Sequence, residues 1–204
     1  MESAESLFDE IRKAGLLITN DWLVRQNNAL DNKTRHIYNC HSLVDLDSHS
    51  VRLDLSTEES AYAVHRWRNF KRHDAWQSLL FEQVPDIKIV ENLYSKKQDF
   101  VISTAAEDIP FDLKVTRYPK SIQGNLTDRE LADWFYRNQS KEGRFHLANR
   151  FFVVGQPEEA LYDIDVARHT IGEFASDMRS YRHFIQHPDG QTSRAVVLRQ
   201  TAAK

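Results

Sequence analysis

Apolar positions near the amino end of the chain recur at helical spacing. They predict a helix over residues 3–17, and Thr19-Asn20-Asp21 is typical of the N-cap of a second short helix. From His36 to Leu55 the spacing changes to two, because apolar and polar residues alternate on both sides of the polar segment 47–50. This alternation predicts a β-hairpin. We therefore expect residues 1–55 to form an N-terminal extension of helices and a hairpin.

A long helix is predicted from residue 56 to Gln83. Ser56 and Glu59 have the spacing of a capping box, and apolar residues then recur at helical spacing as far as Leu80. Pro85 ends this helix, because proline lacks the backbone N–H that a helix interior needs.

Three strands, a helix and a fourth strand are predicted after the long helix. Segments 87–90, 99–103 and 109–116 are rich in β-branched and aromatic residues and are separated by polar loops, which favours an antiparallel meander. Thr127 and Glu130 have capping-box spacing at the start of the next helix, and the apolar segment 151–154 predicts a buried strand. We expect residues 164–184 to be helical and residues 194–199 to form a last strand.

Composition limits the class of protein. The 204 residues, 41% of them hydrophobic, are enough for one ordinary core, and six glycines and five prolines give no sign of a linker. We expect a single domain over residues 1–204, made of an extension (1–55), a core (56–155) and a carboxy-terminal segment (156–204). The net charge of -3 excludes a generally polycationic protein. The single Cys40 excludes an internal disulfide and is typical of a reducing compartment, so we expect a cytoplasmic protein with Cys40 in its core.

The predicted third strand carries the strongest candidate chemistry. Its alternation places Asp112 and Lys114 on one face. Depending on the register between the second and third strands, Asp99 lies beside Asp112. Two adjacent carboxylates repel each other unless a cation lies between them, and Mg²⁺ is bound by one or two carboxylates with water and phosphate oxygens. The alternative is that Asp112 and Lys114 are an ion pair on the solvated face of the strand.

The sequence has an Asp followed, 13 positions later, by an Asp-x-Lys triplet, within the predicted order helix-strand-strand-strand-helix-strand. This arrangement resembles the PD-(D/E)xK nuclease superfamily, which contains many restriction endonucleases. The resemblance covers roughly residues 58–155. Asp99 and Asp112 match the two acidic residues of the motif and Lys114 matches its lysine. No proline precedes Asp99, and Asp112 stands where Glu is commoner in the family. The fold that this resemblance implies is α/β (α+β), with a restriction endonuclease-like core of mixed β-sheet flanked by helices.

The same resemblance implies a Mg²⁺-dependent endonuclease that hydrolyses DNA phosphodiester bonds, most similar to a type II restriction enzyme. Asp99 and Asp112 would hold Mg²⁺, or Mn²⁺ in its place, with the carbonyl of Leu113 as a further ligand, and Lys114 would orient or activate the attacking water. Members of the family often add a helical glutamate and often act as homodimers. The candidates for this further metal ligand are Glu58, Glu59 and Glu82 before the first strand and Glu91 on it, and of these Glu59 and Glu82 are preferred.

Basic residues offer three candidate contacts to DNA. The first lies in segment 65–73, and Trp67 and Phe70 at spacing i, i+3 equally indicate an amphipathic helix with those two rings in the core. The second follows the Asp112–Lys114 strand, and the third lies in the polar stretch 137–150. The candidate residues are Arg66, Arg68, Lys71 and Arg72 in the first, Arg117 and Lys120 in the second, and Arg137 and Gln139 in the third.

Two other functions stay open. One is a non-catalytic nucleic-acid-binding or interaction module on the same fold, and the other is a repair or mobile-element nuclease. The sequence has no Gly-rich phosphate loop and no dinucleotide fingerprint, so we expect no nucleotide cofactor. It also has no apolar run long enough to span a membrane, so we expect no membrane partner.

Overall fold

The computed structural model describes residues 2–17, 27–90, 98–122, 124–138 and 148–201. The backbone divides into two compact units, Met1–Ala75 and Trp76–Lys204. The longest helix, α4 (Thr57–Gln83), contributes residues to both units. The expected single domain, with an extension that ends at residue 55, stays a prediction.

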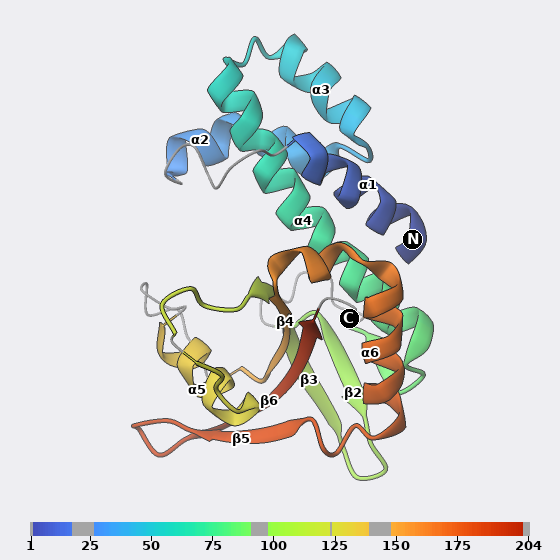
Figure 1. Cartoon of the computed structure of the whole chain (residues 1–204), viewed down its shortest axis with the longest axis vertical. Helices are drawn as coiled ribbons and strands as arrows, with labels where there is room; N and C mark the ends of the chain where they lie inside the picture. Colours follow the sequence, from blue (N-terminus) through green and yellow to red (C-terminus); the bar gives the residue numbers. More distant parts are fainter. Residues whose placement is uncertain (1, 18–26, 91–97, 123, 139–147, 202–204) are drawn as a thin grey trace. The chain divides into compact units, whose positions relative to one another are not determined.

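The first unit is helical in its described part. It contains α1 (Ala4–Leu17), α2 (Asn28–Lys33), the 3-10 helix η1 (Arg35–Asn39), α3 (Leu43–Arg52) and the first part of α4 (Figure 1). Its core includes Cys40 and Trp67, and the Trp67 indole N–H donates a hydrogen bond of 2.9 Å to the Cys40 carbonyl. The predicted first helix and the buried cysteine are thus confirmed, whereas the second helix expected near Thr19-Asn20-Asp21 lies outside the described residues.

The predicted β-hairpin between residues 36 and 55 is wrong. Ser42 and Asp45 form a capping box at the start of α3, in which the Asp45 backbone N–H donates to Ser42 Oγ at 3.2 Å. Leu46 and Ser50, four residues apart, are the buried positions of this helix, while Val44 and Val51 are about three-quarters exposed. The capping box satisfies free backbone N–H groups at the start of the helix, and the buried positions recur at spacing four. Both features favour a helix over the strand that the alternation of period two predicted.

The second unit is built on a six-stranded mixed sheet with the order β1-β2-β3-β4-β6-β5. β1, β2 and β3 form an antiparallel meander; β3, β4 and β6 are parallel; and β5 pairs antiparallel with β6. The strands are β1 (Ile87–Ile89), β2 (Phe100–Ser103), β3 (Asp108–Arg117), β4 (Arg150–Gln156), β5 (Arg182–Gln186) and β6 (Thr192–Thr201). The predicted meander and buried fourth strand are confirmed.

Helices cover both faces of this sheet (Figure 1). α5 (Asp128–Asn138) packs its residue Phe135 against Phe152 of β4, with ring centroids 5.0 Å apart. On the other face α6 (Ile164–Ser176) packs its residue Phe174 against Phe151, at 5.2 Å between centroids. Adjacent residues of β4 therefore point into two separate apolar layers, which explains why the strand is apolar throughout. The chain is a mixed α/β protein, as expected.

The carboxy-terminal helix is shorter than expected. α6 ends at Ser176, and residues 182–184, which fall in the predicted helix, belong instead to β5, which continues to Gln186. Ile185 of β5 joins the core cluster that contains Ala195 and Val197 of β6. Antiparallel pairing with the next strand, β6, and burial of Ile185 thus decided the conformation of this segment. The predicted last strand is confirmed and is longer than expected.

Both expected capping boxes are present. The Glu59 N–H donates to Ser56 Oγ at 3.2 Å, and the Glu130 N–H donates to Thr127 Oγ1 at 3.3 Å. Among the described helices, none is long and apolar enough to span a bilayer.

Candidate functional site

Asp99 and Asp112 lie next to each other at one end of the β2–β3 pairing. The register pairs Phe100 with Phe111, so each aspartate is the next residue toward that end. The Asp99 N–H donates to the Phe111 carbonyl at 2.8 Å, and Asp99 Oδ2 accepts a bond of 2.7 Å from the Leu113 N–H. The sequence left this register open, and the structure has the register that brings the two carboxylates close.

The backbone of Leu113 faces the Asp99 carboxylate. The Asp112 N–H donates to the Asn149 carbonyl at 3.0 Å, on the β4 side of β3. Successive peptide groups of a strand point to opposite sides, so the N–H and the carbonyl of Leu113 both point toward β2. Two carboxylates and one carbonyl oxygen therefore come from one short stretch of the sheet, and oxygen atoms are the donors that a hard divalent cation prefers.

Two cations accompany Asp112. Lys114 Nζ lies 2.8 Å from Asp112 Oδ1, and Arg150 Nε lies 3.7 Å from Asp112 Oδ2. The Asp112 side chain is 22% exposed, that of Lys114 39% and that of Arg150 only 6%. The predicted common face of Asp112 and Lys114 is thus present, and the two side chains pair with each other directly.

Burial raises the pKa of the Asp112 carboxyl above its ordinary value. The neighbouring Lys114 ammonium lowers this pKa, Asp99 raises it and Arg150 lowers it, and the net direction is upward. A raised pKa with opposing charges nearby is typical of functional carboxylates, although buried ion pairs in a scaffold also show it. The Asp99 carboxylate is therefore close enough to Asp112 to raise the pKa of the Asp112 carboxyl.

Arg150 was named only within a polar stretch of the sequence, and its position beside Asp112 was not foreseen. It directly precedes the apolar strand segment 151–154, and β3 and β4 pair Asp112 with Arg150. Its guanidinium carbon also lies 5.4 Å from the centre of the Tyr136 ring on α5. Gln77 was missed entirely: its side-chain amide donates to the Asp99 carbonyl at 3.3 Å. No sequence pattern links either residue to the aspartates, since both contacts depend on tertiary packing.

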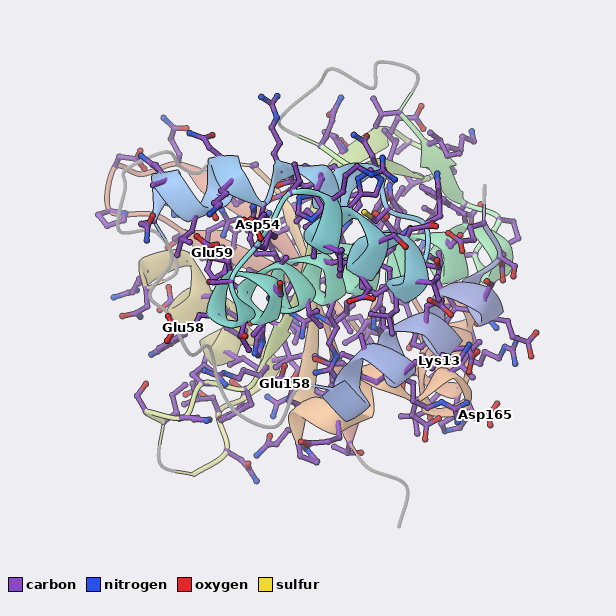
Figure 2. All side chains as sticks on the ribbon, turned by 90° about the horizontal axis from the view of Figure 1, so that it is seen from above. Lys13, Asp54, Glu58, Glu59, Glu158 and Asp165 are labelled. Atoms are coloured by element: carbon purple, nitrogen blue, oxygen red, sulfur yellow. The ribbon has the colours of Figure 1, made fainter. Side chains whose placement is uncertain are left out.

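The described candidate glutamates lie in different parts of the structure. Glu59 accepts two bonds of 2.7 Å from Lys33 Nζ within the first unit, which, with the Ser56 cap, explains its position. Figure 2 labels Glu58 and Glu59 at the first turn of α4. Glu82 is exposed in the last turn of α4, and Glu91 lies outside the described residues. The described residues contain no group of three or more His, Cys, Asp or Glu side chains placed to hold a metal ion.

The first basic candidate surface is largely engaged inside the first unit. Arg66 bonds to the Asp31 carbonyl at 2.8 Å and to Thr34 Oγ1 at 2.7 Å. Arg68 donates to the Ile11 carbonyl at 3.3 Å, and the buried Lys71 lies 3.4 Å from Glu2. Of the two rings, Trp67 is fully buried and Phe70 is half-buried, and Arg72 is buried as well.

The other basic candidates are more exposed. Arg117 at the end of β3 lies 3.7 Å from Glu158, which Figure 2 labels, and Lys120 is exposed beyond it. Arg137 on α5 is 70% exposed and lies 2.8 Å from Asp133. Gln139 lies outside the described residues. Phosphate contact by any of these groups stays a prediction.

No protein-family model, curated protein or solved structure matches the chain.

Proposed function

We propose that this protein is a Mg²⁺-dependent endonuclease that hydrolyses phosphodiester bonds of DNA. The observation that carries the proposal is the approach of Asp99 to Asp112 at one end of the sheet, with Lys114 paired to Asp112. The order α4-β1-β2-β3-α5-β4 is the order implied by the resemblance to the PD-(D/E)xK superfamily. A restriction endonuclease-like core, a homodimer and a type II restriction activity belong to the same proposal.

The donor set suits a hard divalent cation. Asp99, Asp112 and the Leu113 carbonyl supply oxygen atoms from two adjacent strands, and Mg²⁺ in phosphate-handling sites is commonly held by one or two carboxylates and completed by water and substrate. A divalent ion bound there would supply a more acidic water and a polarised phosphoryl oxygen. Because one or two carboxylates can hold Mg²⁺ together with water and substrate, the absence of a group of three acidic side chains among the described residues does not oppose the proposal.

The side chains have separate roles in this proposal. Asp112 and Asp99 would bind the divalent cation. The hydrogen bond from the Leu113 N–H to Asp99 Oδ2 fixes the direction of the Asp99 carboxylate. Lys114 is the part-exposed cation on the Asp112 face, so its ammonium is placed to orient a water or to stabilise negative charge on a phosphate. Lys114 would leave Asp112 Oδ1 when it does so.

The test is DNA cleavage with matched variants. Supercoiled plasmid and single-stranded DNA are incubated with the purified protein in Mg²⁺, Mn²⁺ or excess EDTA. We expect metal-dependent cleavage that falls at least about a hundredfold in Asp112→Asn and in Lys114→Met. Asp108→Asn on the exposed end of β3 and Lys88→Met on β1 are matched controls that keep activity.

A second measurement distinguishes a DNA that lacks a cleavable site from a protein that is not a nuclease. Mg²⁺ binding to the folded protein raises its melting temperature, and Asp112→Asn abolishes that rise. Discrete fragments would favour a restriction enzyme over a structure-specific repair nuclease. If the protein neither cleaves DNA nor responds to Mg²⁺ in melting, the nuclease proposal is wrong, and salt-sensitive DNA binding indifferent to Mg²⁺ would identify a binding module instead.

A further inference from the structure

Arg150 is a buried cation at the edge of the candidate site. Its side chain is 6% exposed, and the parallel register of β3 and β4 places it directly beside Asp112. Burying a guanidinium is costly unless a carboxylate or another polar group compensates its charge. Asp112 Oδ2 at 3.7 Å supplies that compensation, and the Tyr136 ring at 5.4 Å adds a cation–π contact.

The surroundings of Arg150 are fixed from several sides. The Tyr136 hydroxyl donates to the Ala148 carbonyl at 2.9 Å, which ties α5 to the segment just before β4. Asn149 accepts the Asp112 N–H at its carbonyl, and its side-chain amide donates to the Pro110 carbonyl at 3.0 Å. Asn149, the residue before Arg150, is therefore bonded to β3 at both Pro110 and Asp112.

The two oxygens of Asp112 have different partners. Oδ1 faces Lys114, whose side chain is 39% exposed and carries its ammonium on a flexible stem. Oδ2 faces the buried Arg150. Arg150 is thus the cation whose position is set by packing. The two aspartates and the two cations together leave the site with no net formal charge, which weakens its attraction for a further cation.

We propose that Arg150 is a positioning residue of this site, which holds the Oδ2 side of Asp112 in place and lowers the affinity of the site for a divalent cation. This inference rests on the proposed metal-dependent function. A scaffold role alone predicts that loss of Arg150 weakens every property of the protein. A positioning role predicts that loss of Arg150 strengthens cation binding and weakens turnover, because a repelling charge and an orienting contact are lost together.

The variants separate charge from shape. Arg150→Met keeps an unbranched apolar stem beside Tyr136 and removes the charge, so the Kd for Mn²⁺ is expected to fall about tenfold and kcat to fall as well. Arg150→Lys keeps the charge, so its Kd is expected to stay within about twofold of the wild-type value, with kcat between those of the wild type and Arg150→Met. Arg168→Met on α6, an exposed arginine beside Asp165, makes the same charge change as a control and leaves both constants unchanged.

The decisive experiment is titration calorimetry of each folded protein with Mn²⁺ in the absence of DNA, followed by cleavage kinetics. Folding of each variant is checked by circular dichroism, and Arg150→Lys provides the comparison if Arg150→Met is unstable. If Mn²⁺ binding is lost in Asp112→Asn but is unchanged or weaker in Arg150→Met, the inference about Arg150 is overturned and the proposed function stands. If the wild-type protein neither binds Mn²⁺ nor cleaves DNA, the proposed function fails, and the inference fails with it.

Discussion

Replacing Gly155 on β4 with alanine is predicted to destabilise the protein, because there is no room for the added methyl group. A Cβ built on Gly155 would lie 2.5 Å from Leu161 Cγ and 3.0 and 3.1 Å from the two Leu161 methyl carbons. Carbon atoms pack at about 3.5–4.0 Å, so Leu161 would have to retreat by about 1 Å. Leu161 is fully buried, and its carbonyl accepts the Trp76 indole N–H at 3.1 Å, which leaves the segment η2 (Glu158–Tyr162) little room to move.

The magnitude follows from two opposing effects. Overpacking of a core costs about 1–3 kcal/mol, while replacing glycine by alanine restricts the unfolded chain and returns about 0.4–1 kcal/mol. We therefore expect Gly155→Ala to lower the free energy of unfolding by about 1–2 kcal/mol and the melting temperature by about 2–8 °C.

The assay is urea denaturation followed by tryptophan fluorescence and circular dichroism. Gly172→Ala is the matched control, because no heavy atom lies within 4 Å of its Cβ position on α6 and the helix gains about 0.5–1 kcal/mol from alanine. The double variant Gly155→Ala/Leu161→Ala should be less destabilised than the sum of its single changes, since the second change removes the clashing atoms. A Gly155→Ala protein as stable as the wild type would refute the close-contact argument.

Two further predictions concern the helical first unit. Ser42→Ala removes the side-chain acceptor of the Asp45 N–H and should lower the free energy of unfolding by about 1 kcal/mol, with a loss of helical circular dichroism. The control Ser48→Ala, on the exposed side of α3, should change neither. Equal effects of the two substitutions would contradict the capping box. Burial, and then the charge of the stacked His49, lowers the pKa of His36, so the unfolded chain binds a proton more readily and the free energy of unfolding falls as the pH decreases below about 6.5. Urea denaturation at pH 7.5 and 5.5 should show a smaller pH dependence for His36→Gln than for the wild type or the exposed-site control His169→Gln, and three equal slopes would speak against it.

Local patterns predicted the elements whose stabilising contacts are close in sequence. The capping boxes of Ser56 with Glu59 and of Thr127 with Glu130 involve residues three apart, and both are present. The alternating face of β3, with Asp112 and Lys114 together, is likewise a property of one strand.

Two segments were predicted wrongly. Residues 36–55 contain apolar residues at a spacing that fits a strand and a short helix almost equally, and burial of Leu46 in the helical core of the first unit decided for the helix. The predicted helix included residues 182–184, yet pairing with β6 and burial of Ile185 made residues 182–186 a strand. In the first segment the core partners Ala14, Ala63 and Trp67 lie outside it, and in the second the pairing strand β6 begins six residues after β5 ends.

The candidate site divides in the same way. The sequence by itself determined which chemistry is available, because Asp99, Asp112 and Lys114 are placed by strand alternation and by the order of elements. Only the tertiary structure decided the register that brings Asp99 next to Asp112, the bond from the Leu113 N–H to Asp99, and the buried Arg150 on the neighbouring strand. The physical reason is that alternation fixes which face a side chain occupies, whereas the register of hydrogen-bonded pairing between strands fixes which side chains lie next to each other on that face.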